Sequence, residues 1–137
     1  MAAPTFEREF VASPEHIDIL GHVNNTVWIQ WMEQVATSHW EAVASAEHQE
    51  AYFWVVVRHE VDYLRPAFDG DRITARTWAE PPQGAKSVRV MEFVGNDGRP
   101  CVRARTTWAI IDKAAGRPIR VPAEVIAPFL DPDGDRA

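Results

Sequence analysis

One long amphipathic segment constrains the fold of this chain more than any other feature. Apolar side chains recur in it at the i, i+3, i+4 and i+7 spacing of a helix that buries one face. The residues that set this spacing are Val27, Trp28, Trp31, Met32, Val35, Ala36, Trp40 and Val43. We therefore expect a helix over about residues 25–46, ending where the polar run 47–50 interrupts the pattern.

Strand patterns occupy most of the remaining chain. Residues 5–11 predict a short first strand, and apolar and polar side chains alternate through 52–64, 72–80, 87–94 and 102–111. An Asn-Asp-Gly sequence between the last two segments is a hairpin signal. One helix packed on a run of hairpin-linked strands predicts an α+β fold with an antiparallel sheet.

Two finer expectations follow from the same patterns. A short terminal helix is expected over residues 122–130. In segment 52–64, strict alternation would place six side chains on one face of the strand. These side chains are Phe53, Val55, Val57, His59, Val61 and Tyr63. On that apolar face we expect His59 to be a hydrogen-bonded core residue and not a metal ligand.

Composition narrows the classes of partner. The 137 residues fit one domain, which we place at residues 1–130, followed by a polar tail at 131–137. The net charge of -6 argues against nucleic acid and anionic membranes as partners. With no visible signal peptide or membrane-spanning run, we expect a cytoplasmic protein. A lone Cys101 excludes an internal disulfide and a cysteine-based zinc site, and no metal motif is visible, so we expect no cofactor.

The loop before the long helix carries the candidate chemistry. Residues 18–25 read Asp-Ile-Leu-Gly-His-Val-Asn-Asn, and either Asn24 or Asn25 is a natural N-cap. The free N–H groups and the positive end of the helix dipole then lie close to Asp18. A carboxylate beside such donors suits acyl chemistry, in which the N–H groups stabilise an oxyanion. The simpler interpretation is that Asp18 shapes the turn.

This loop resembles that of the hotdog-fold acyl-CoA thioesterases, most closely the 4-hydroxybenzoyl-CoA thioesterase group. A second matching stretch, residues 63–71, reads Tyr-Leu-Arg-Pro-Ala-Phe-Asp-Gly-Asp. The likeness in element order spans roughly the whole chain. It implies a hotdog fold, an antiparallel sheet of about five strands wrapped around one long central helix. It also implies an acyl-CoA substrate and a homodimer or a homotetramer built as a dimer of dimers.

The resemblance assigns catalytic roles to residues of the loop. Asp18 would be the nucleophile or the general base, and the sequence does not choose between these roles. The backbone N–H of Asn25 would polarise the thioester carbonyl, with His22 assisting or structural. Gly21 and Asn24 would contribute to substrate binding.

Other positions match the family less closely. Trp28 stands where the family usually has Tyr, and we place it in the substrate site as a retained aromatic residue. The Lys86-Ser87 pair would contact the CoA nucleotide, and Arg89, Arg117 and Arg120 could join it across a subunit boundary. The simpler interpretation is that these are solvated charges at a strand edge. Glu33 is either a solvated helix residue or a second acid, since other hotdog branches place a carboxylate on this helix.

Two alternative functions stay open from the sequence. The His-Val-Asn-Asn run is similar to acyl-ACP thioesterases, but Leu20 stands where those enzymes carry a polar catalytic residue. A non-catalytic acyl-CoA-binding protein on the same fold would use the same surfaces. No Gly-x-Ser-x-Gly elbow is present, which argues against a serine hydrolase. The identity of the acyl group lies beyond the sequence.

Overall fold

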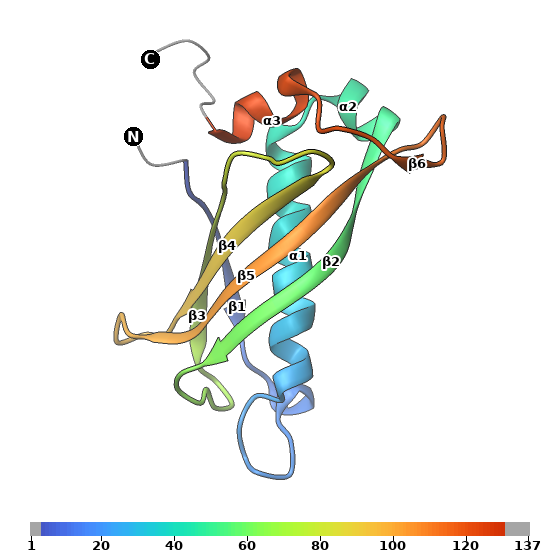
Figure 1. Cartoon of the computed structure of the whole chain (residues 1–137). Coiled ribbons are helices and arrows are strands. Elements are labelled where there is room, and N and C mark those ends of the chain that lie inside the picture. The colour runs from blue at the N-terminus through green and yellow to red at the C-terminus, as the bar shows by residue number, and fades with distance from the viewer. Residues whose placement is uncertain (1–3, 131–137) are drawn as a thin grey trace.

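A curled antiparallel sheet wraps around one long helix (Figure 1). The computed structural model describes residues 4–130, so the predicted tail at 131–137 lies outside the described residues. The elements in chain order are β1 (Phe6–Val11), a 3-10 turn (Pro14–His16), α1 (Asn25–Val43), α2 (Ala46–Ala51), β2 (Tyr52–Tyr63), β3 (Arg72–Ala79), β4 (Lys86–Val94), β5 (Pro100–Asp112), β6 (Arg117–Pro118) and α3 (Ala123–Leu130).

The sheet confirms the predicted α+β hotdog architecture. Its strand order is β1-β3-β4-β5-β2, with the two-residue β6 added beside β5. Every pairing is antiparallel. Strand β6 lies in a stretch that reads as a connection in the sequence, which is why six strands are present where about five were expected. Strands β1 and β2 form the two edges of the main path.

Helix α1 begins and ends at identifiable caps. The Asn24 side chain accepts a hydrogen bond from the Thr26 N–H at 2.9 Å, which makes Asn24 the N-cap. The helix ends at Val43, before the expected residue 46. A second cap, Ser45, accepts from the His48 N–H and starts α2, so the polar run 47–50 is helical.

The face of α1 predicted to be buried does pack against the sheet. Its buried residues are Val27, Trp28, Trp31, Met32, Val35, Ala36 and His39. Phe93, from the middle of the sheet, is fully buried and packs edge-on against Trp28 with ring centroids 5.4 Å apart. A second apolar cluster forms where α3 covers the far end of the sheet, around Ile110 and Phe129.

Strand β2 contains a β-bulge that the sequence pattern does not reveal. Its register with β5 shifts between Val56 and Arg58, so Val57 is an extra residue. Successive residues on a strand point to opposite faces, and one extra residue therefore reverses the face of all that follow.

The bulge overturns the prediction that six β2 side chains share one face. Trp54 opposes Ile110 and His59 opposes Thr106, and both of those partners are fully buried. Thr106 also opposes Arg89, which contacts His39 of α1, so this face of the sheet is the one toward the helix. Trp54 and His59 therefore face the helix, on either side of the bulge. Phe53, next to Trp54, projects from the opposite side of the strand to His59; it lies at the exposed edge of the sheet, where it still borders the cavity described below.

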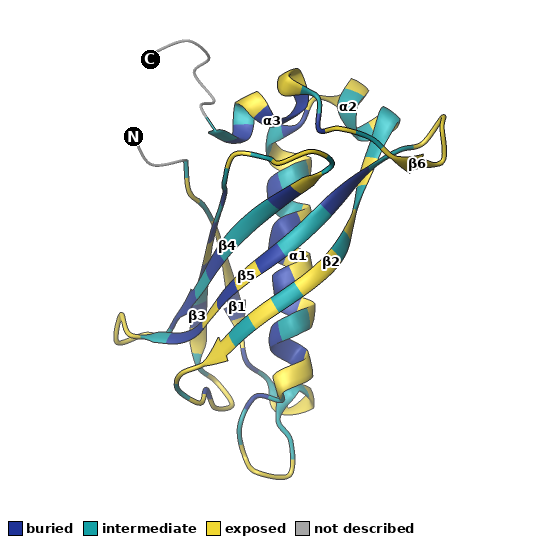
Figure 2. Cartoon of the chain, viewed as in Figure 1, coloured by how far each residue is buried: buried dark blue, intermediate teal, exposed yellow. Residues whose placement is uncertain are grey.

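The β2 edge is the least covered part of the sheet. None of its residues is buried, as Figure 2 shows along the whole ribbon. Phe53, Val55 and Val57 are 43%, 41% and 52% exposed. An exposed apolar edge strand of 12 residues offers unpaired backbone groups to another strand.

Candidate active site

The loop that carries Asp18 is a tight, internally bonded turn. Ile17 and Val23 form an isolated antiparallel bridge across it. The Asp18 N–H donates to the His22 carbonyl at 2.9 Å, and the Gly21 N–H donates to the Asp18 carbonyl at 3.0 Å. Gly21 has φ of 86°, a left-handed conformation that favours glycine.

The Asp18 carboxylate helps to shape this turn. Its Oδ1 accepts the Leu20 N–H at 2.9 Å, which is the simpler of the two interpretations of Asp18. Within the described residues, Oδ2 accepts no hydrogen bond and is left for other contacts. A turn-forming role and a chemical role are therefore compatible, because one oxygen holds the side chain and the other is free.

The start of α1 is anchored on several sides. The Asn24 N–H donates to the His16 carbonyl and the Val23 N–H to the Ala67 carbonyl, each at 2.9 Å. The Tyr63 hydroxyl reaches the Asn25 carbonyl at 3.5 Å. The Asn25 N–H has no acceptor among residues 4–130. A free donor on a rigid helix start is suited to bind an oxyanion.

His22 and Trp28 take structural positions in the single chain. The His22 ring packs edge-on against Phe68, 5.8 Å between centroids, and no hydrogen bond joins it to the Asp18 carboxylate in the described part of the chain. Trp28 is 2% exposed and packs against Trp31 and Phe93. Its place is therefore in the core under the helix start.

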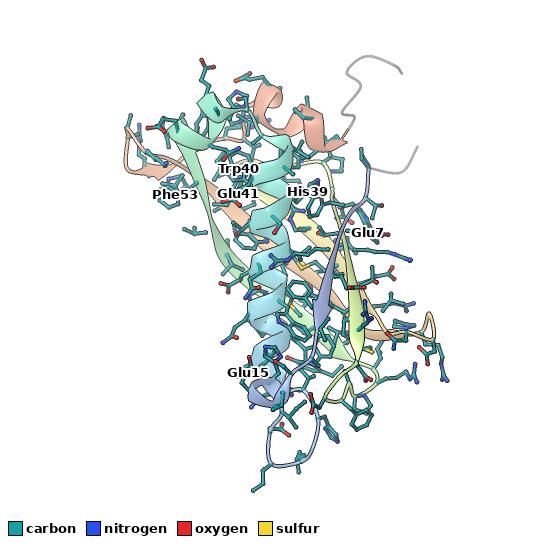
Figure 3. All side chains as sticks on the ribbon, turned by 180° about the vertical axis from the view of Figure 1, so that it is seen from behind. Glu7, Glu15, His39, Trp40, Glu41 and Phe53 are labelled. Atoms are coloured by element: carbon teal, nitrogen blue, oxygen red, sulfur yellow. The ribbon has the colours of Figure 1, made fainter. Side chains whose placement is uncertain are left out.

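A cavity of about 200 Å³ opens between α1, the sheet and α3. Its aromatic walls are Trp40, Phe53, Trp54, Trp108 and Phe129. Figure 3 shows Trp40 and Phe53 toward the C-terminal end of α1, with Glu15 beside the opposite end. At 1.5 Å per residue, the start of the helix and Trp40 are separated by about 22 Å along its axis.

Two polar side chains of β4 line the same cavity. Ser87 and Arg89 lie two residues apart and so share the inner face, whereas Lys86 is exposed. Arg89 contacts His39 and Thr77 and lines the cavity, so its simpler interpretation as a solvated charge at a strand edge is wrong. The signal was present in the sequence: Arg89 alternates in step with Met91 and Phe93, both fully buried. The predicted contact of Arg89 with the CoA nucleotide across a subunit boundary stays a prediction.

Arg89 is held by two neutral partners. Its Nη1 lies 2.7 Å from Nδ1 of His39 and donates to the Thr77 hydroxyl at 3.1 Å. Burial, and then the adjacent guanidinium, lower the pKa of His39 from 6.5 to about 3. The ring is therefore neutral at physiological pH and accepts from Arg89. Burial lowers the pKa of Arg89 to about 10, which still leaves it protonated.

Glu33 and His59 form a loose contact at the middle of α1. Glu33 is exposed, as expected for a solvated helix face, and its Oε2 lies 3.9 Å from Nε2 of His59. Nδ1 of His59 is buried without a hydrogen-bond partner. The prediction that His59 is a hydrogen-bonded core residue is therefore wrong.

Basic residues gather outside the cavity near Lys86. The Val121 N–H donates to the Gly84 carbonyl at 2.9 Å, so the segment that contains Arg120 runs beside the loop that leads into β4. Arg117 and Arg120 are both exposed. In residues 4–130 no group of three His, Cys, Asp or Glu side chains could hold a metal ion. The helices in the same range are too short or too polar to cross a membrane.

Comparison with known proteins gives one family. The family model of the thioesterase-like superfamily matches residues 12–129. No curated protein matches the sequence. Among solved structures, a predicted thioesterase from Bacillus stearothermophilus superposes with a TM-score of 0.81 at 22% identity, over 92% of this chain and 94% of that one.

Two further structures were solved with coenzyme A. A hypothetical protein from Staphylococcus aureus in complex with CoA has a TM-score of 0.82 at 15% identity, covering 95% of this chain and 86% of that one. A thioesterase from Thermus thermophilus, complexed with coenzyme A and Zn, has a TM-score of 0.80 at 25% identity, covering 94% of this chain and 98% of that one.

Proposed function

The chain belongs to the thioesterase-like superfamily and is a thioester hydrolase, and on this premise we propose that it cleaves acyl-CoA thioesters at the start of α1. One observation carries the proposal. At the rigid start of α1, the Asn25 N–H has no acceptor and Oδ2 of Asp18 accepts no hydrogen bond among residues 4–130. The structures of similar proteins with bound CoA support CoA as the carrier.

The chemistry follows from these two groups. The Asn25 N–H donates to the thioester carbonyl oxygen and stabilises the negative charge that develops on it. Asp18 either adds to the carbonyl carbon or removes a proton from an attacking water. The C–S bond then breaks, and the CoA thiolate leaves with the bonding electron pair. A thiolate is a good leaving group, so no strong general acid is required.

The cavity and Asp18 lie too far apart to serve one small acyl group within a single chain. We place them together in a homodimer paired through the β2 edges. Tyr63, at the end of β2, touches the start of α1, whereas Phe53, at its beginning, borders the cavity. Antiparallel pairing of two β2 strands would set the cavity of one subunit beside Asp18 of the partner subunit.

The remaining predicted contacts concern the CoA nucleotide. Lys86 is on the exposed side of β4 and has Arg120 on a neighbouring segment, which suits phosphate binding. Ser87 faces the cavity, so we assign it to the acyl end of the substrate and not to the nucleotide. Gly21 and Asn24 support the site through the turn and the cap.

The decisive experiment measures thiol release from acyl-CoA esters by wild type and by Asp18→Asn. The asparagine still accepts the Leu20 N–H, so the loop is expected to keep its shape. Turnover should fall by roughly 10²–10⁴-fold, while CoA-ester binding persists. Glu7→Gln is the matched control, because Glu7 of β1 is an exposed carboxylate that pairs with Arg76, at the sheet edge opposite β2. An Asp18→Asn enzyme with wild-type turnover would exclude the assigned role of Asp18.

The carrier is tested separately. The same acyl chain is offered on CoA and on acyl carrier protein, and kcat/KM is compared. The proposal expects CoA to be preferred, since Leu20 replaces the polar residue that acyl-ACP thioesterases carry. A clear preference for acyl-ACP would reverse this part of the proposal.

A further inference from the structure

We propose that the cavity beside α3 selects acyl groups with an aromatic ring that carries a carboxylate at its far end, and that Arg89 and Ser87 bind this carboxylate. The inference rests on the proposed function, because it names the acyl group that the site takes.

Arg89 is a cation without an anionic partner in the described part of the chain. Each ion pair in the described residues involves other side chains, and none of them brings a carboxylate to Arg89. Its two partners, His39 and Thr77, are neutral. An unpaired charge inside a protein costs free energy, so a residue of this kind suits an anion supplied from outside.

The free edge of the Arg89 guanidinium is complementary to a carboxylate. Both bonds in the described residues use Nη1, which leaves Nε and Nη2 without partners. These two nitrogens carry parallel N–H groups that bind the two oxygens of a carboxylate together. Both nitrogens stay accessible. Among residues 4–130, the buried side-chain polar atom that lacks a hydrogen-bond partner is Nδ1 of His59, and no atom of Arg89 is in that state.

Ser87 supplies a second hydrogen-bond donor to the cavity. Ser87 is 5% exposed and lies two residues before Arg89 on the same face of β4. Its hydroxyl makes no hydrogen bond to another described residue, and it lines the cavity. A serine hydroxyl can donate to a carboxylate that is already held by the guanidinium. Two polar side chains of one strand therefore line a cavity whose other walls are mainly aromatic.

The walls define the rest of the acyl group. Trp40, Trp54, Trp108 and Phe129 are rigid, flat side chains. The cavity of about 200 Å³ exceeds the roughly 150 Å³ of an apolar cavity that holds benzene. One substituted ring therefore fits within this volume. A neutral ring would leave Arg89 dehydrated and unpaired, so the cavity should discriminate against it.

The test compares three CoA esters: 4-carboxybenzoyl, 4-methylbenzoyl and benzoyl. Wild type should prefer the carboxylated ester, and Arg89→Met should lose on the order of 10- to 100-fold in kcat/KM for that ester alone. Arg89→Lys keeps the charge but loses the paired N–H groups, so its kcat/KM for the carboxylated ester should lie between those of wild type and Arg89→Met. Arg103→Met is the control, because Arg103 pairs with Glu92 on the outer face of the sheet.

A binding measurement separates this inference from the proposed function. Calorimetry with benzene-1,4-dicarboxylate and with benzoate requires no turnover. Tighter binding of the dicarboxylate that is lost in Arg89→Met supports the inference, even if every CoA ester stays intact and the proposed function fails.

Two results would overturn the inference. One is a wild-type enzyme that does not favour the carboxylated ligand in either assay. The other is an Arg89→Met protein that keeps this preference. If that variant also dissociates into monomers in sedimentation, Arg89 pairs with an acid of a second subunit. Circular dichroism of each variant verifies that the comparison is between folded proteins.

Discussion

The N-cap of α1 provides a quantitative test of the link between stability and catalysis. Asn24→Ala removes the oxygen that accepts the Thr26 N–H and the Thr26 hydroxyl, both at 2.9 Å. The hydroxyl is exposed and can turn to water, so the loss comes mainly from the N–H. Removal of such a cap costs about 1 kcal/mol of unfolding free energy.

The expected size of the effect can be measured in two ways. For a domain of this length, 1 kcal/mol corresponds to a fall in Tm of about 3–5 °C. Urea unfolding should show the same loss of free energy without a change in its dependence on urea. Both measurements are made at one protein concentration, because the Tm of an oligomer depends on concentration.

The effect on turnover tests the role of the helix start. Because the cap holds the residue whose N–H is assigned to the oxyanion, kcat should fall by about tenfold, the equivalent of 1.4 kcal/mol. Asn24→Ser is the matched control, since serine is also a good cap and should restore both stability and kcat. A loss of stability in Asn24→Ala with unchanged kcat would refute the role of the Asn25 N–H.

Three other predictions concern pH, assembly and CoA. The pKa of His39 is about 3 in the folded protein and 6.5 as the ordinary value, so between these two pH values the unfolded chain binds more protons than the folded one. The contribution of His39 to the free energy of unfolding should therefore be fully present above pH 6.5 and be lost as the pH falls. Urea unfolding at several pH values should show a flatter pH dependence for His39→Gln. Val57→Lys places a charge on the exposed β2 edge and should give a monomer in sedimentation with little turnover, whereas a fully active monomer would contradict the shared site. Lys86→Ala should raise KM for acyl-CoA several-fold without lowering kcat, and the loss should shrink at high salt; a fall in kcat alone would argue against a phosphate contact.

Much of the fold could be predicted because its patterns are local. The apolar spacing of α1, its cap at Asn24 and the alternation in the strands each depend on residues a few positions apart. The turn around Asp18 also depends only on its own segment. Steric and hydrogen-bonding preferences act within such windows, so one sequence is sufficient to read them.

The errors arose where a local pattern was open to two outcomes. The bulge at Val57 depends on how β2 pairs with β5, and a run of Val55 to Val57 offers no polar residue to mark it. Helix α1 ends at Val43, and Ser45 caps a separate helix, α2, so the polar residues 47–50 are helical. The alternation pattern predicts a hydrogen-bonded core position for His59, but its Nδ1 has no hydrogen-bond partner among residues 4–130 once β2 and α1 are packed.

The candidate site also has a part that local sequence predicts and a part that depends on distant segments. The sequence by itself determined that Asp18 and a capped helix start lie together, because they are neighbours in the chain. Only the tertiary structure decided that Arg89 meets His39 across 50 residues, faces a cavity with tryptophan walls and lacks an acid partner. A cavity and an unpaired charge are properties of what surrounds a residue, and those surroundings come from distant segments that meet only on folding.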